Sequence, residues 1–161
     1  MKYLVISDSH GYNENIRKVI EIERPVEAVF HCGDLECHVA DIERITGCSV
    51  IAISGNNDFY FHELQPQRMI TRQGHRILMV HGHRQGVNFT TSRLLYLAME
   101  NQADIVMFGH THIPCHEEEG GITLLNPGSI SIPRQSNKKP TYAIMEISED
   151  GLCHFTMKEL S

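Results

Sequence analysis

The sequence predicts an α/β fold in which two packed, mixed β-sheets are flanked by helices, a four-layer αββα sandwich. In the first third of the chain, short β-prone runs alternate with helical patterns, which is typical of parallel βα units. In the second half, glycine-containing turns separate β-prone runs, which is typical of antiparallel hairpins. A chain that uses both arrangements is expected to pack two sheets together rather than to build one doubly wound sheet.

The first half of the chain predicts three strands with helices between them. Asn13 is the expected N-cap of a first helix, which Pro25 stops. A weaker helical pattern over residues 36–46 is closed by Gly47. The expected strands are residues 3–6, 26–31 and 49–53.

The second half predicts hairpins and one further helix. An apolar helical pattern over residues 90–100 leads into a buried strand over residues 105–108. Residues 142–147 are expected to pair with the following run, in which apolar and polar residues alternate. The expected hairpin turns are Gln73-Gly74, Gly120-Gly121 and Asp150-Gly151.

Composition narrows the class of protein. A length of 161 residues suits a single domain over residues 1–161, and a net charge of −6 without basic runs argues against general nucleic-acid binding. Five scattered cysteines do not fit a disulfide framework and suit a reducing compartment. No apolar run has the length of a signal-peptide core or of a membrane helix. We therefore expect a cytoplasmic protein without a membrane segment.

Polar, metal-competent side chains follow five of the β-prone runs. The carboxyl ends of strands in open α/β sheets face the ligand crevice, and imidazole is the commonest protein ligand for metals. A lone His-x-His pair such as His110 and His112 is more often an ordinary polar loop, but here four other runs end in the same way. The candidate ligands are Asp8, His10, Asp34, Asn56, His81, His110 and His112.

This ligand set is too large for one ordinary metal site. Tetrahedral zinc takes about four protein groups, whereas a two-metal centre needs a bridging carboxylate and about three further ligands on each side. Asp34 stands alone on its loop and is the natural bridge. Two divalent cations with Asp8, Asp34 and one bridging hydroxide would leave a charge of about +1, which favours a singly charged phosphate diester.

Five motifs resemble those of the calcineurin-like metallophosphoesterases, and specifically their small single-domain phosphodiesterase group in bacteria and archaea. A further similarity to that small group is Asn126-Pro127-Gly128-Ser129. The five motifs are Asp8-Ser9-His10, Gly33-Asp34, Gly55-Asn56-Asn57-Asp58, His81-Gly82 and Gly109-His110-Thr111-His112.

The resemblance implies the αββα fold and hydrolysis of a phosphate ester by a metal-bridging hydroxide. It implies two divalent metal ions, with manganese first and zinc, iron or nickel as the other choices. One ion would be held by Asp8, His10, Asp34 and His112, and the other by Asp34, Asn56, His81 and His110.

One position departs from the wider superfamily, in which a histidine often follows the asparagine ligand and contacts the phosphate or protonates the leaving group. Here that residue is Asn57, whose amide donates a hydrogen bond but cannot supply a proton. Asp58 follows it, and His83 lies two residues beyond His81. We predict Asn57, Asp58 and His83 as catalytic residues.

The favoured function is a metal-dependent phosphodiesterase whose partner is a small phosphate-ester substrate, and a homo-oligomer is compatible with the sequence. A phosphomonoesterase and a dinucleotide-polyphosphate hydrolase are the alternatives within enzymes. A non-catalytic binding scaffold of the same fold is the alternative outside them. A scaffold has no chemical need for metal-competent side chains at every ligand position, so the enzyme is preferred.

Overall fold

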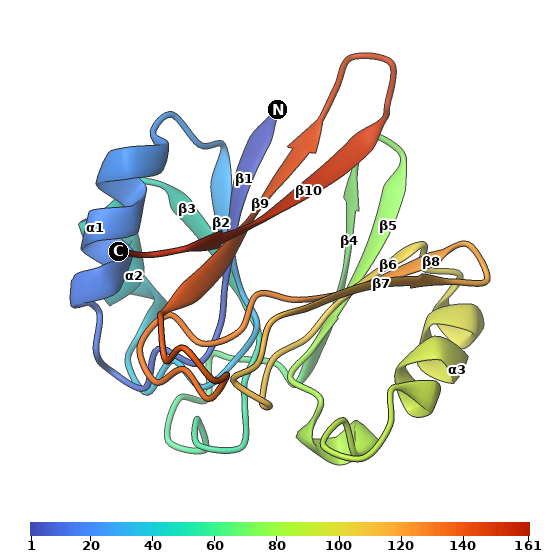
Figure 1. The fold of residues 1–161 in the computed structure, drawn as a ribbon, viewed down its shortest axis with the longest axis horizontal. Coiled ribbons are helices and arrows are strands. Elements are labelled where there is room, and N and C mark those ends of the chain that lie inside the picture. The colour runs from blue at the N-terminus through green and yellow to red at the C-terminus, as the bar shows by residue number, and fades with distance from the viewer.

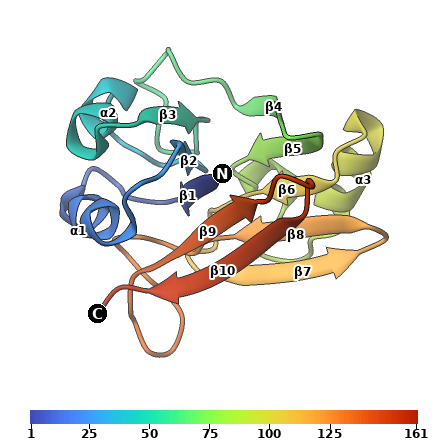
Figure 2. The same ribbon diagram turned by 90° about the horizontal axis from the view of Figure 1, so that it is seen from above.

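The structure, a computed structural model that describes all 161 residues, confirms the predicted αββα layering (Figure 1). Two five-stranded sheets pack face to face. Helices α1 and α2 cover the outer face of one sheet, and α3 covers the outer face of the other, as Figure 2 shows from above. No helix has both the length and the apolar character that crossing a bilayer requires.

Strands and helices alternate in the first part of the chain, and most elements in the second part are strands. In chain order they are β1 (Lys2–Ile6), α1 (Glu14–Glu23), β2 (Ala28–His31), α2 (Val39–Thr46), β3 (Ser49–Ala52), β4 (Gln67–Arg72), β5 (His75–Val80), the 3-10 helix η1 (His83–Gln85), α3 (Ser92–Asn101), β6 (Ile105–Met107), β7 (Cys115–Glu119), β8 (Ile122–Asn126), β9 (Thr141–Ile147) and β10 (Cys153–Glu159).

The first sheet has the strand order β10-β9-β1-β2-β3. The pairs β1–β2 and β2–β3 are parallel, as the alternating βα pattern predicts. The final hairpin returns to the start of the chain, where β9 pairs with β1 in an antiparallel register that places Leu4 opposite Ile144. Strand β1 is therefore central, and its residues Tyr3–Ile6 are buried, which explains its continuous apolar run.

The second sheet has the order β4-β5-β6-β8-β7 and is less purely antiparallel than the turn signals suggest. The three predicted turns do form hairpins, joining β4 to β5, β7 to β8 and β9 to β10. However, β5–β6 and β6–β8 are parallel pairs, and α3 makes the crossover between β5 and β6. Turn residues in the sequence indicate only pairs of strands that follow each other directly. The parallel pairs made through longer connections could therefore not be predicted from them.

Three apolar layers hold the sandwich together. The largest lies between the sheets and includes Phe30 from β2 and Met79 from β5. The others lie beneath the helices, where Ile16 and Ile20 of α1 pack on the first sheet and Leu94 of α3 packs on the second. Together they fix the two sheets so that the loops after β1, β2, β3, β5 and β6 meet at one end of the molecule (Figure 1).

Some predicted boundaries differ from the observed ones. Strand β2 begins at Ala28 rather than residue 26, and α2 begins at Val39 rather than residue 36. The residues before α2 instead continue the loop that carries Asp34. Gly47 closes α2 in the left-handed conformation, with a φ of 68°, as predicted.

Candidate metal centre

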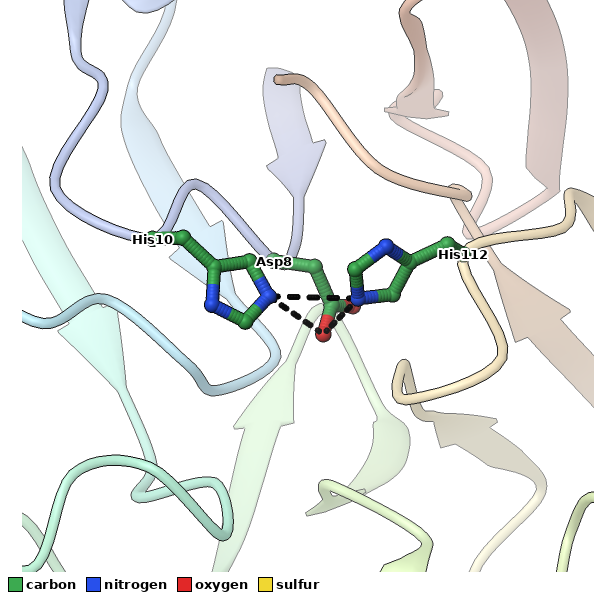
Figure 3. Close-up of side chains that lie close together, drawn as sticks. All are labelled: Asp8, His10 and His112. Atoms are coloured by element: carbon green, nitrogen blue, oxygen red, sulfur yellow. Dashed lines mark hydrogen bonds and ion pairs between the residues drawn. The ribbon is translucent and has the colours of Figure 1, made fainter. Parts of the chain in front are cut away.

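The structure brings the predicted ligands together from five loops. Figure 3 shows Asp8 between the rings of His10 and His112, which come from the loops after β1 and β6. The Nε2 atom of His112 lies 3.2 Å from Asp8 Oδ1, and the Nε2 atom of His10 lies 3.8 Å from the same oxygen. The two Nε2 atoms are 3.1 Å apart. Ligands about 2.0–2.2 Å from one metal lie at about these separations from each other, so the three residues fit one ion.

A second group is formed by Asp34 and His81 together with Asp8. The Nε2 atom of His81 is 3.4 Å from Asp34 Oδ2 and 3.7 Å from Asp8 Oδ1. Asp34 Oδ2 also lies 3.7 Å from His10 Nε2, so this carboxylate faces both groups, as a bridge must. Asp8 reaches both groups as well, whereas the resemblance assigns it to one metal alone.

Asn56 and His110 lie beside the second group. His110 Nδ1 is 3.1 Å from Asn56 Oδ1, and the His110 ring centroid is 5.2 Å from that of His81. The other ring nitrogen of His110 lies 3.2 Å from the amide of Asn88, a contact that the sequence did not indicate. Asn56 and His110 are thus adjacent to the predicted second metal position, and their role as its ligands stays a prediction.

Hydrogen bonds to backbone carbonyls fix the orientation of two rings. His81 Nδ1 lies 2.7 Å from the carbonyl oxygen of Cys32, and His112 Nδ1 lies 2.6 Å from that of Ile132. A carbonyl oxygen only accepts, so each Nδ1 carries a proton, and when the ring is neutral each Nε2 presents a lone pair. The lone pairs therefore face Asp8 and Asp34, which are themselves acceptors.

The resulting cluster of acceptors fits a cation. Asp8 Oδ1 and His81 Nε2 are both buried and have no hydrogen-bond partner. The other oxygen of Asp8 is occupied by the Ser7 hydroxyl, at 2.6 Å, and by the backbone N–H of His110, at 3.1 Å. Buried acceptors without donors are costly, and a shared divalent ion satisfies all of them at once.

Both carboxylates are held in the charged form. Burial raises the pKa of Asp8, but in the metal-free site the nearby imidazoles of His112 and His81, when they carry a second proton, outweigh it, so the pKa lies below its usual value. For Asp34, burial is likewise outweighed by His81 and by Asn57, and the pKa is again lowered. Two ionised carboxylates at neutral pH are what a divalent cation needs.

The three residues predicted as catalytic occupy different places. Asn57 donates to Asp34 through both its backbone N–H and its side-chain amide, each at 2.9 Å, so it positions the predicted bridge. Asp58 is buried and accepts backbone N–H groups of Leu35, Glu36 and Gly55, which ties two ligand loops together. His83 lies beside the second group, with its ring centroid 5.4 Å from that of His81. Their catalytic roles stay predictions.

Sequence reasoning missed the groups that support the ligands. His31 is fully buried at the end of β2, with Nε2 2.9 Å from the Ser9 hydroxyl and Nδ1 accepting the N–H of Gly33. Burial lowers the pKa of His31 to about 3, so the ring is neutral. Glu36 contacts Nδ1 of His10. The one available signal was a histidine that ends an otherwise apolar run at residues 28–31.

Comparison with known proteins places these residues in a family. The profile described as "Calcineurin-like phosphoesterase superfamily domain" matches residues 1–150. A probable metallophosphoesterase of Bacillus subtilis, YsnB, is 33% identical over 152 residues, covering 94% of this chain and 87% of its own. The phosphodiesterase YfcE of Escherichia coli is 29% identical over 160 residues, covering 85% of this chain and 83% of its own.

A solved structure agrees with the sequence matches. The crystal structure of a predicted phosphoesterase from Streptococcus pneumoniae superposes with a TM-score of 0.80 at 30% identity, covering 99% of this chain and 97% of the other. The fold, the candidate metal ligands and the sequence similarity thus all indicate the same family. This chain belongs to the calcineurin-like phosphoesterase superfamily, a family of metal-dependent enzymes that hydrolyse phosphate esters.

Proposed function

We propose that this protein is a phosphodiesterase that works with two divalent cations, manganese first among them. One cation would be held by Asp8, His10, Asp34 and His112, and the other by Asp34, Asn56, His81 and His110. The observation that carries the proposal is the pair of buried acceptors without partners, Asp8 Oδ1 and His81 Nε2. When bound, such a pair of cations lowers the pKa of a water molecule and neutralises charge on the phosphate oxygens.

The residues of the chain prepare this site before any substrate enters. Carbonyl oxygens aim the Nε2 lone pairs of His81 and His112, and Asn57 holds the Asp34 carboxylate from the other side. Preorganised ligands of this kind need no rearrangement during the reaction. His83 stands beside the second ligand group, where it is placed to contact an ester oxygen of the substrate.

Charge favours a diester over a monoester. With two divalent cations bound, Asp8 and Asp34 would offset half of their charge, and one hydroxide would reduce the remainder to about +1. A phosphate diester carries one negative charge and matches this value. The name of the Escherichia coli relative supports the same choice. A phosphomonoesterase and a dinucleotide-polyphosphate hydrolase are the alternatives, and a non-catalytic scaffold is less well supported.

We also propose that residues 1–161 act as one domain. Asp8 and His112 contribute to the same ligand group although they are far apart in sequence, and the final hairpin completes the first sheet. The cytoplasmic location, the lack of general nucleic-acid binding and a homo-oligomer stay predictions.

The proposal is tested with metal-free protein that is resupplied with single metals and assayed on matched mono- and diesters. We expect hydrolysis of bis(p-nitrophenyl) phosphate to return with Mn²⁺ and to exceed that of p-nitrophenyl phosphate. Faster hydrolysis of the monoester would favour the phosphomonoesterase. Absence of hydrolysis with every metal, although metal binds, would favour the scaffold.

A further inference from the structure

A cleft of about 320 Å³ opens beside the candidate metal centre. It lies between the loop after β3 and the short helix η1. Asn56 and His83 line it, and these two residues also border the second ligand group, where His83 lies 6.0 Å from His110 between ring centroids. The cleft is therefore continuous with the place where a phosphate would bind. Its size is at the lower end of the range for small-molecule pockets, about 300–1,000 Å³.

The far wall of this cleft is aromatic. Phe59, Phe61 and His62 all line it, and they come from one short stretch of the loop after β3. Phe59 is 65% exposed and the next residue, Tyr60, is 76% exposed, so the two form a small exposed aromatic patch. The Phe59 ring lies 4.3 Å from the neighbouring Tyr60 ring between centroids, so the two rings support each other at the rim.

The opposite wall carries an uncompensated positive charge. Arg84 lines the cleft, lies at the surface and takes part in no ion pair or side-chain hydrogen bond with the rest of the chain. The one acidic residue in the lining, Asp58, is already satisfied by three backbone N–H groups. A planar guanidinium stacks on aromatic faces and attracts anions, so it suits a flat ligand attached to a phosphate.

We infer that this cleft binds a planar aromatic group carried by the phosphate ester, such as a nucleobase or an aryl ring, and so determines which esters the site accepts. The inference rests on the proposed function, because the phosphate would lie at the metal centre. Rings of Phe59, Phe61 and His62 offer stacking faces that accept any planar group. Ser54, Asn56 and Arg84 also line the cleft, so polar side chains are available to the edge of a planar group whose faces meet the aromatic rings.

The test uses phosphate monoesters with one organic group each, so that whichever group enters the cleft is known. The probes are methyl, cyclohexyl and phenyl phosphate and thymidine 5′-monophosphate, bound to the Mn²⁺-loaded protein and followed by calorimetry. We expect phenyl phosphate and thymidine 5′-monophosphate to bind about tenfold more tightly than methyl phosphate, with cyclohexyl phosphate between them. Tighter binding of phenyl phosphate would indicate an aryl ester as the substrate, and tighter binding of thymidine 5′-monophosphate would indicate a nucleotide.

Phe59→Ala should remove most of this advantage and leave the affinity for methyl phosphate unchanged, whereas Arg84→Ala should weaken the planar ligands most and methyl phosphate to a smaller degree, because its charge attracts every phosphate. Phe89→Ala is the matched control, because Phe89 is 93% exposed near the same end of the molecule but does not line the cleft. Phe59→Leu keeps an apolar side chain without the ring and should behave like Phe59→Ala. Phe59, Arg84 and Phe89 are all exposed, so each variant should fold normally.

The outcomes separate this inference from the proposed function. Equal affinities for the four ligands in a protein that hydrolyses diesters would overturn the aromatic cleft alone. Preference for the planar ligands in a protein that hydrolyses no ester would support the cleft and overturn the proposed function. Failure to bind any of the four ligands and to hydrolyse any ester would overturn both.

Discussion

At the scale of single residues, the candidate site depends on space that only glycine leaves. A Cβ atom placed on Gly55 would collide with the carboxylate of Asp34, and one placed on Gly109 would collide with the hydroxyl of Ser7. These glycines lie in the loops that carry Asn56 and His110. Gly55 therefore makes room for the carboxylate of Asp34, and Gly109 for Ser7 and the carboxylate of Asp8, which explains why a glycine precedes the ligand in these two motifs.

Gly55→Ala should displace Asp34 and lower the affinity for both metals by at least about tenfold, since the bridging ligand would move. Metal titration of the purified variant measures this effect, and circular dichroism checks that the protein is folded. Gly120→Ala is the control, because a Cβ there meets nothing within 4 Å. Unchanged metal affinity in Gly55→Ala would show that Asp34 is not a ligand.

Asn57 leads to a prediction about leaving groups. Its side-chain amide donates a hydrogen bond to Asp34 but cannot transfer a proton to the leaving group. The ester oxygen therefore leaves as an anion unless another group protonates it. The hydrolysis rate should then fall steeply as the leaving-group pKa rises. A series of diesters with graded leaving groups measures the slope. A flat dependence would contradict this prediction, and a steep slope that appeared only in His83→Ala would identify His83 as the donor.

Single residues also mark what could be predicted from the sequence. Asp8, Asp34, His81 and His112 were recognised because each follows a β-prone run, and the structure brings them together. The carbonyl oxygens of Cys32 and Ile132 that orient the imidazoles could not be recognised, because every residue has a carbonyl. The loop-tying role of Asp58 was hidden for a similar reason, since its partners are backbone N–H groups.

At the scale of elements, a buried carboxylate ties α1 to the first sheet. Glu23, the last residue of α1, contacts Lys2 of β1 at 2.9 Å and Lys158 of β10 at 2.8 Å, and it accepts the hydroxyl proton of Tyr142 at 2.8 Å. These partners are spread over the whole chain. Nothing local distinguishes Glu23 from the other glutamates of α1, so the sequence offered no sign of this contact.

Glu23→Gln should lower the free energy of unfolding by about 2 kcal/mol at pH 7, after allowing for the partial exposure of the two lysines. Burial raises the pKa of Glu23, but Lys158 and Lys2 lower it more, to about 2. Because the pKa of Glu23 is lower in the folded protein, its charge stabilises the fold fully at pH values above the pKa of the unfolded chain, about 4.5. This stabilisation is lost as the pH falls towards 2.

Denaturant unfolding at pH 7, 4 and 3 measures the difference between the two proteins. We expect the destabilisation of Glu23→Gln to shrink over this range and to be absent in Glu21→Gln, a change on the exposed side of α1. A difference that stayed constant down to pH 3 would mean that the charge of Glu23 does not stabilise the helix contact.

Element types were predictable, but their order in space was not. Hydrophobic patterns and turn residues located the three α-helices and most strands, including β1, β3 and β5, but not the short helix η1. The return of β9 to β1 and the place of β8 beside β6 depend on contacts between residues more than a dozen positions apart. Strand β7 was expected only through its hairpin turn, Gly120-Gly121, because its exposed glutamates resemble a solvated hairpin end, which is compatible with an edge strand.

At the scale of the whole molecule, the candidate centre lies where the two sheets meet. Asp8 and Asp34 come from the first sheet, and His81 and His112 come from the second. The core between the sheets fixes their separation, so the ligand distances depend on the packing of the entire sandwich. The layering was predictable from the mixture of parallel and antiparallel signals, which is why the ligands could be expected to converge.

The central claim is that one chain binds two divalent cations that share Asp34. The most direct test is the metal content of the Mn²⁺-reconstituted protein, measured by mass spectrometry together with protein concentration. We predict two ions per chain in the unmodified protein, fewer than one in Asp34→Asn, and two in the exposed control Asp150→Asn. A single ion per chain in the unmodified protein, or two in Asp34→Asn, would contradict this account.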